Sequence, residues 1–311
     1  RERKHAPQAR AKRATAADMG STLGRANQLA NFDDNFATHS SGVQEETEQD
    51  CLRFYLDLND LHESDVEALR EAGFLSAAQE PLLLRDKTVA YLRKGLEHPL
   101  GPSYVSLDAS RPWLVYWMLH ALELLDAFPE DLVPRLRNTL RACLASDNLG
   151  FGGGFLQAGH TAPTYASVLA LCTLGDEESL AIIDREATYK FFMGLKMPSG
   201  GFAVQKDGEV DTRGLYTVLA VASILNILTP ELTAGCAEFV QRSQTFEGGI
   251  GGEPGNEAHG GYAFCALASL CILERHDAID VNALVDWIAH RQMRLEGGYQ
   301  GRTNKLVDAC Y

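Results

Sequence analysis

The C-terminal stretch of the sequence, residues 294–311, carries two pairs of side chains that could do chemistry. Arg302 and Lys305 can neutralise a phosphate, because arginine offers a fork of donors and lysine a compact point charge. Asp308 and Cys310 can hold zinc through a carboxylate and a thiolate. Together the two pairs predict a reaction between a thiol and a phosphorylated partner. Taken alone, the stretch favours a plainer interpretation, a Gly-rich turn that carries solvated charges and an incidental buried cysteine.

This stretch is the last copy of a repeat, which favours the chemical interpretation. A Gly-Gly turn followed by a large apolar residue recurs at spacings of 47, 48 and 49 residues, as Gly153-Gly154-Phe155, Gly200-Gly201-Phe202, Gly248-Gly249-Ile250 and Gly297-Gly298-Tyr299. After each turn a tyrosine is expected to open an apolar helix: Tyr165, Tyr216, Tyr262 and Tyr311. An earlier, degenerate copy runs from Gly101 to Tyr116. Repetition at this period predicts a helical array rather than a mixture of domains.

Each copy contains two unlike helices. The helix before the turn is amphipathic, and Val281, Leu284, Val285 and Ile288 are expected to share its buried face. The helix after the turn is apolar nearly all round, as in residues 218–228, and should be covered on both sides. No segment shows sustained strand alternation. The sequence therefore predicts an all-α fold in which inner and outer helices alternate and close into an α/α barrel.

In such a barrel the turns that precede the inner helices open onto the same end of the cavity. The residues expected on this rim are Asp108, Arg111, Trp113, His160, Thr164, Tyr165, Asp211, Arg213, Tyr216, His259, Gly261 and Tyr262, together with the C-terminal set. Each has a plain structural explanation, with the histidines as caps, the tyrosines as core and Asp211 with Arg213 as a local ion pair. Their convergence from several copies predicts a binding site.

The composition limits the classes of partner. The first thirteen residues carry a net charge of +5, so the remaining residues carry about −19. Such an acidic domain argues against nucleic acid as a partner, because binding to the phosphate backbone needs positive charge. Residues 1–47 read as a disordered basic and polar tail, and residues 48–311 as the barrel, cut short at its C-terminal end. No apolar run is long enough for an integral membrane segment. The seven cysteines, odd in number and mostly in apolar helical runs, indicate reduced, cytoplasmic usage.

Three motifs resemble the protein farnesyltransferase β-subunit family: residues 107–113 (LDASRPW), 248–265 and 301–311 (GRTNKLVDACY). The resemblance covers the chain from about residue 85 to its end. It implies an α/α barrel that pairs with a helical α subunit. It also implies zinc-dependent transfer of farnesyl from farnesyl diphosphate to the cysteine of a C-terminal CaaX motif in a protein substrate, with Mg²⁺ assisting departure of the diphosphate.

The resemblance also assigns roles residue by residue. It implies Asp308 and Cys310 as zinc ligands, with a third ligand, a histidine, beyond residue 311. It implies that the diphosphate is bound by His259, Arg302, Lys305 and Tyr311. It also implies a catalytic contribution from Lys305 and Tyr311. It implies an isoprenoid and peptide pocket lined by Trp113, Trp117, Tyr165, Arg213, Tyr216, Gly261, Tyr262 and Cys265. The resemblance also implies that the geranylgeranyl branch of the family has a smaller side chain at the position of Trp113.

Other functions remain open at this stage. Within the family, the alternative is a geranylgeranyltransferase type I β subunit. A terpene cyclase also uses α/α barrels with aromatic linings, but it needs an Asp-rich motif that this sequence lacks. A non-catalytic barrel that binds an isoprenoid is the alternative from another class, and zinc retention discriminates against it because a mere binder has no use for the metal.

Overall fold

The computed structural model describes residues 62–73, 75, 82–147, 149–293, 297–303, 305, 307 and 308, and four isolated residues upstream, 39, 42, 43 and 46. Its main elements are α3 (Glu63–Glu71), α4 (Arg85–Glu97), η1 (Pro102–Ser110), α5 (Arg111–Leu124), η2 (Glu130–Leu132), α6 (Val133–Ala142), α7 (Thr161–Leu174), α8 (Glu177–Leu180), α9 (Arg185–Leu195), α10 (Thr212–Ile224), α11 (Pro230–Thr233), α12 (Cys236–Ser243), α13 (Gly260–Ile272), η3 (His276–Ala278) and α14 (Val281–Ala289).

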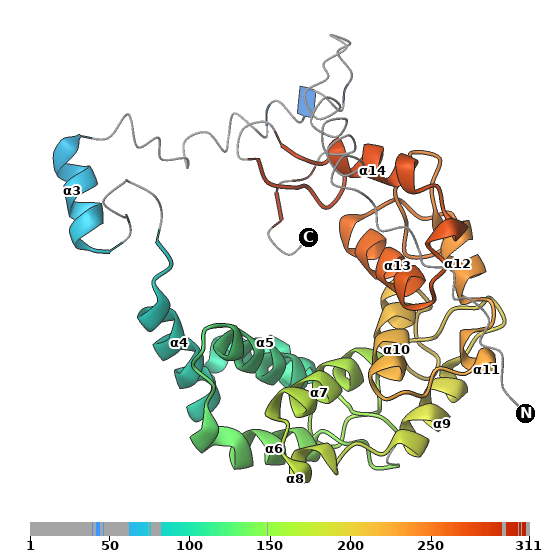
Figure 1. Ribbon diagram of the computed structural model, residues 1–311, viewed down its shortest axis with the longest axis horizontal. Coiled ribbons are helices and arrows are strands. Elements are labelled where there is room, and N and C mark those ends of the chain that lie inside the picture. Colours follow the sequence, from blue (N-terminus) through green and yellow to red (C-terminus); the bar gives the residue numbers. More distant parts are fainter. Residues whose placement is uncertain are drawn as a thin grey trace, which may run out of the picture.

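The helices form two concentric layers of an arc. Helices α5, α7, α10 and α13 lie side by side on the inside, and α6, α9, α12 and α14 lie outside them (Figure 1). The core lies between the layers, where Leu119 and Leu122 of α5, Leu215 and Leu219 of α10 and Phe239 of α12 are buried. Pairing across the described residues is confined to isolated bridges at the turns. None of the described helices is long and apolar enough to cross a membrane.

The inner helices α7 and α10 are buried over most of their length because they have no polar face. Along α10, nine residues between Thr212 and Ala222 are buried, which requires neighbours on both sides of the helix. Small residues such as Ala220 and Ala222 allow these neighbours to approach closely. The inner position that the sequence predicts for this helix is confirmed.

One backbone bond joins each copy to the next. The first N–H of every inner helix donates to a carbonyl of the following copy: Arg111 to Gly153 at 2.9 Å, Thr161 to Val204 at 2.8 Å, Thr212 to Gly252 at 2.9 Å and Gly260 to Gly301 at 2.8 Å. These N–H groups have no partner within their own helix, because the first turn of an α-helix lacks preceding carbonyls. The following copy supplies the missing acceptor and so determines the register between copies.

The copies align differently from the sequence prediction at two points. The aromatic mark of the first full copy is Phe151, not Phe155, because Phe151 is buried and its carbonyl accepts from the N–H of His160, whereas Phe155 is 69% exposed. The inner helices also begin earlier than predicted. Tyr165 and Tyr216 each lie five residues after the cap of their helix. In the next copy this position holds Phe264, not Tyr262.

The buried face of the outer helix α14 differs from the predicted one. Leu284 and Trp287 are buried, whereas Val281 and Ile288 are 39% and 37% exposed. The prediction of this face was wrong because the indole of Trp287 packs against Gly249 of the turn and so orients the helix. At α11 the Thr229 hydroxyl caps the helix start by accepting from the N–H of Leu232.

The predicted division of the chain into a tail, residues 1–47, and a barrel, residues 48–311, stays a prediction. Apart from isolated positions, the predicted tail, residues 1–47, and the start of the predicted barrel, residues 48–61, lie outside the described residues.

Packing at the turn gives a first prediction. A Cβ added to Gly153 would lie 1.8 Å from the Ala109 carbonyl oxygen. Gly153→Ala should therefore force the two backbones apart, weaken the Arg111 to Gly153 bond and destabilise the fold by about 1–3 kcal/mol. Gly194→Ala is the matched control, because Gly194 is an exposed position of α9 and nothing lies within 4 Å of the added Cβ. There helix propensity should stabilise the fold by up to about 1 kcal/mol. Equal free energies of unfolding for the two variants in urea would contradict the packing argument.

Candidate functional site

The site lies at the N-terminal ends of the inner helices, where one capping residue of each copy faces the rim. Nδ1 of His160 accepts from the N–H of Ala162 at 3.1 Å, and Nδ1 of His259 accepts from the N–H of Gly261 at 3.1 Å. The carboxylate of Asp211 caps α10 through the N–H groups of Arg213 and Gly214. The predicted role of the histidines as caps is thus confirmed.

Capping also determines how the two imidazoles carry a proton. Because Nδ1 accepts from the backbone, the proton of the neutral ring is on Nε2, which is therefore a donor. Burial lowers the pKa of His259, and the charge of Arg302 lowers it further. Burial is also the main cause that lowers the pKa of His160. Both rings therefore favour the neutral form, with an Nε2–H donor.

Asp308 holds the equivalent position in the fifth copy. Its N–H donates to the Tyr299 carbonyl at 3.0 Å, as the N–H of His259 donates to Ile250 at 3.1 Å and the N–H of His160 to Phe151 at 3.0 Å. The hairpin before it is held by the Gln300 side chain, which is buried and donates to the Lys305 carbonyl at 2.8 Å. The predicted metal-binding carboxylate thus occupies the capping position of its copy.

Two arginines reach the rim, and each pairs with a carboxylate of its own surroundings. Arg213 makes several contacts with Asp211, from Nε at 3.1 and 3.2 Å and from Nη2 at 2.5 Å, and these bonds raise its pKa. Arg302 makes one ion pair, from Nη1 to Glu257 Oε2 at 3.0 Å. The Asp211–Arg213 pair that the sequence predicts is confirmed, whereas the Glu257 contact was not predicted.

A cavity of about 570 Å³ joins these cations to an apolar wall. Its lining consists of Arg213, His259, Gly261, Tyr262, Phe264, Cys265 and Arg302. All except Phe264 are predicted site residues. The lining combines two guanidiniums and an imidazole with the rings of Tyr262 and Phe264. Such a cavity suits a ligand with an anionic head and an apolar body.

Aromatic rings continue this wall across three inner helices. Ring centroids are 5.4 Å apart for Trp117 and Trp113, 5.7 Å for Trp113 and Tyr165, 5.6 Å for Tyr165 and Tyr216, and 5.4 Å for Tyr216 and Phe264. Offset and edge contacts at these distances are favourable for aromatic pairs. The structure therefore brings together all the predicted aromatic residues of α5, α7 and α10 in one surface.

The polar atoms along the wall are held uncharged. Burial and the Tyr216 hydroxyl, 3.4 Å away, raise the pKa of Tyr165. Burial raises the pKa of the Cys265 thiol to about 12. Cys265 therefore stays a neutral thiol at physiological pH and is a wall residue rather than a nucleophile.

The predicted metal site is described only in part. Lys305 and Asp308 are exposed on the last hairpin, while Cys310 and Tyr311 lie outside the described residues. Within the described ranges no three His, Cys, Asp or Glu side chains gather as they would around a metal ion. The exposed carboxylate of Asp308 is a suitable zinc donor, and the remaining ligands would have to come from residues outside this description.

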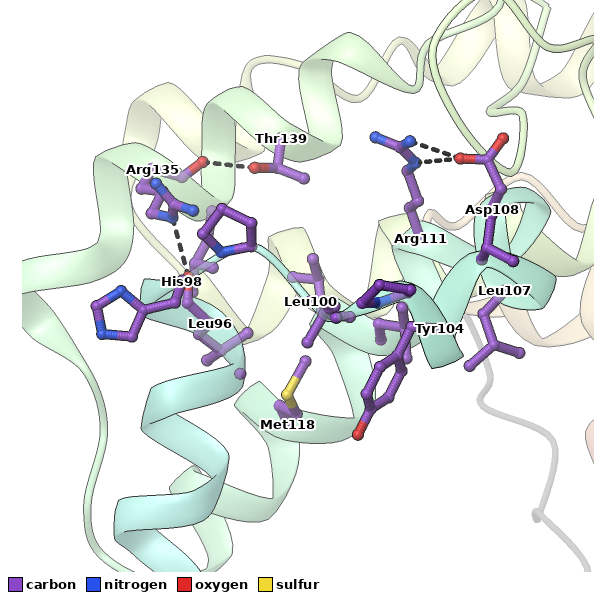
Figure 2. A pocket seen from close by; sticks show the side chains of 18 residues that line it. Leu96, His98, Leu100, Tyr104, Leu107, Asp108, Arg111, Met118, Arg135 and Thr139 are labelled. Atoms are coloured by element: carbon purple, nitrogen blue, oxygen red, sulfur yellow. Dashed lines mark hydrogen bonds and ion pairs between the residues drawn. The ribbon is translucent and has the colours of Figure 1, made fainter.

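Two other cavities lie near the first copies. One of about 410 Å³ includes Trp113 and His160 in its lining. The other, of about 510 Å³, lies between α4, η1, α5 and α6. Figure 2 shows Arg111 directed at Asp108 and Arg135 at the Leu96 carbonyl, so both guanidiniums of its described lining are already engaged. This second cavity offers no anion site comparable to the rim.

Three residues of the site were not predicted from the sequence. Tyr116 contacts Trp113 and Tyr165, Phe264 contacts Tyr216, and Glu257 binds Arg302. Tyr116 is detectable from its helical spacing to Trp113, and Phe264 from an alignment of the copies on their capping residues. No local signal identifies Glu257, because its partner lies 45 residues away.

Comparison with known proteins gives consistent matches. Residues 83–311 match the family described as prenyltransferase alpha-alpha toroid domain. The protein farnesyltransferase subunit beta of Arabidopsis thaliana is 49% identical over 228 residues, 73% of this chain and 47% of that protein. The corresponding subunit of Pyricularia oryzae is 40% identical over 304 residues, 91% of this chain and 57% of that protein. The predicted resemblance to farnesyltransferase β subunits is confirmed, and the chain spans about half the length of the curated relatives it matches.

The fold has a solved counterpart. The structure of Candida albicans protein geranylgeranyltransferase-I complexed with GGPP aligns with a TM-score of 0.62 at 21% identity, over 73% of this chain and 74% of that one. The predicted all-α architecture, an α/α barrel of inner and outer helices, is confirmed by this match and by the family.

The capping histidines predict a pH dependence of stability. Burial in the folded state lowers the pKa of His160 and of His259 below the usual value for histidine, so the unfolded chain binds protons more readily. Their contribution is therefore present above pH 6.5 and is lost as the pH falls through the folded pKa values. His160→Asn keeps a cap but not the titration, and should flatten the decline of the free energy of unfolding between about pH 7.5 and 5.

His160→Ala is the matched comparison for this experiment. It removes the titration and the cap together, so it should flatten the same slope but cost about 1 kcal/mol at pH 7.5. An asparagine variant whose stability falls as steeply as that of the wild type would show that proton uptake by His160 is not linked to folding.

Proposed function

The chain belongs to the prenyltransferase α-α toroid family, and from this premise we propose that it is part of a protein farnesyltransferase β subunit. The proposed reaction transfers farnesyl from farnesyl diphosphate to the cysteine thiol of a C-terminal CaaX motif, in a heterodimer with an α subunit. The observation that carries the proposal is the cavity in which Arg302 and His259 meet the aromatic wall of Tyr262 and Phe264. A prenyl diphosphate has the same two parts, an anionic head and an apolar chain.

The rim residues would stabilise the departing diphosphate. His259 presents an Nε2–H donor in its neutral form, held by the bond from Gly261 to Nδ1. Arg302 adds a guanidinium with further N–H groups beyond the one that contacts Glu257. Lys305 and Tyr311 are proposed to complete this set. Donors that are in place before the reaction stabilise charge as it develops, which is the largest electrostatic contribution in many enzymes.

The aromatic wall would hold the apolar chain and exclude water. Trp113, Tyr165 and Tyr216 form a continuous surface, and burial keeps the Tyr165 phenol protonated. Such a surface contributes through the apolar area it covers and positions the reacting carbon near the rim. Arg213 is tied to Asp211 and would form part of this wall rather than bind the leaving group.

A zinc ion is proposed at the fifth capping position. Asp308 and Cys310 would hold it together with ligands from residues not described here. When bound, zinc supplies a thiolate at neutral pH, because it lowers the pKa of a coordinated thiol. The bond from the Asp308 N–H to the Tyr299 carbonyl holds Asp308 at the position equivalent to His259, which supports a metal site on the same side of the barrel as the proposed diphosphate site. Magnesium is proposed to assist departure of the diphosphate.

Two substitutions test whether metal binding and diphosphate binding are separate. Cys310→Ala in the full-length protein with its α subunit should abolish zinc binding and transfer, yet leave farnesyl diphosphate binding largely intact. Arg302→Ala should do the reverse and weaken binding by about 1.5–3 kcal/mol, the size of a charge-assisted hydrogen bond. Zinc is measured by elemental analysis and diphosphate affinity by calorimetry. Equal loss of diphosphate affinity in both variants would refute the division of roles.

Trp113 provides the test for farnesyl over geranylgeranyl transfer. Its indole packs between Trp117 and Tyr165, so it fills part of the wall that an isoprenoid would follow. A packed wall accepts an extra isoprene unit only with strain of about 1–3 kcal/mol. Trp113→Thr should open the wall and raise geranylgeranyl transfer relative to farnesyl transfer. A variant that keeps the wild-type melting temperature and donor preference would rule out this role and return the geranylgeranyltransferase alternative to consideration.

A further inference from the structure

The two arginines of the cavity differ in how firmly their carboxylates hold them. Asp211 is nearly buried, caps α10 and contacts Arg213 through two oxygens. Removing Arg213 from Asp211 would leave a buried carboxylate without its counter-ion, which is costly. Glu257 is 57% exposed and contacts Arg302, itself 44% exposed, through one oxygen. Water can replace either partner of this second pair, so Arg302 is the arginine that can change partners.

We propose that Glu257 competes with the diphosphate for Arg302 and thereby weakens diphosphate binding and speeds its release. The proposal rests on the proposed function, because it requires an anion in this cavity. Glu257 lies two residues before His259 and reaches across from the fourth copy to the fifth. It therefore holds a negative charge beside both rim groups that would receive the diphosphate.

The Glu257 carboxylate and a bound diphosphate carry charges of like sign. A diphosphate on Arg302 and His259 would lie within a few ångströms of the Glu257 carboxylate, and like charges at that distance repel. In the empty site the same carboxylate keeps Arg302 over the cavity. When the anion arrives, Arg302 exchanges a single contact with Glu257 for contacts with phosphate oxygens. Glu257 thus lowers the affinity for the anion while the guanidinium stays in place.

The chain offers a matched control in the preceding copy. Glu209 also lies two residues before a cap, is 61% exposed and is 3.6 Å from an arginine, Arg213. That arginine is already held by Asp211. Removing the Glu209 charge therefore leaves the guanidinium engaged, whereas removing the Glu257 charge leaves Arg302 without its carboxylate partner.

The experiment uses the full-length protein with its α subunit, and inorganic pyrophosphate as the probe. Glu257→Gln should tighten pyrophosphate binding in calorimetry about two- to fivefold, the effect of one exposed charge, and the gain should shrink as salt is raised. KM for farnesyl diphosphate should fall with no gain in kcat. Glu257→Asp, which keeps the charge, should remain close to the wild type. Glu209→Gln should leave pyrophosphate affinity unchanged.

Each outcome is decisive. Unchanged or weaker pyrophosphate binding in Glu257→Gln, in a protein whose affinity still falls on Arg302→Ala, overturns the competition and assigns Glu257 a purely supporting role. An equal gain in Glu209→Gln also overturns it, since the effect would then be a general one of net charge. If the wild type binds no pyrophosphate and Arg302→Ala changes nothing, the proposed function itself fails.

Discussion

Every inner helix begins with an N–H group whose acceptor belongs to the next copy. The bonds from Arg111 to Gly153 and from Thr212 to Gly252 are two of four at the same position in the repeat. A buried N–H without an acceptor is costly, so neighbouring copies are held in one register. The arc of Figure 1, with its inner and outer layers, depends on this repeated contact as much as on apolar packing.

The same contact explains where the functional side chains lie. In the second, third and fourth copies the capping residue comes directly before the bonded N–H, so its side chain is held at the start of the inner helix. Histidine and aspartate both accept hydrogen bonds from the helix start, as His160, Asp211 and His259 do. The chemistry of the rim can therefore vary from copy to copy without a change of fold. In this chain it ranges from a neutral donor to a carboxylate.

The charges at the rim are balanced by the protein itself. Arg213 is neutralised by a nearly buried carboxylate and Arg302 by an exposed one, although the two arginines line the same cavity. The difference lies in the desolvation of the carboxylate, because nearly buried Asp211 keeps its counter-ion whereas exposed Glu257 can exchange its partner for water. One cavity thus contains a permanent and an exchangeable positive charge, beside an aromatic wall that carries none.

The sequence by itself determined the all-α class, the repeat, the buried inner helices and most of the site, because these follow from composition, hydrophobic period and the short motifs around His259 and Arg302. It misplaced Phe155, because local spacing cannot reveal which residue of a glycine-rich turn is buried, and it overlooked Phe264, because the copies were aligned on their tyrosines rather than on their capping residues. Only the tertiary structure showed the bonds between copies and the pairing of Glu257 with Arg302. Both join groups some 40 residues apart, and such contacts depend on how the helices pack rather than on any local pattern.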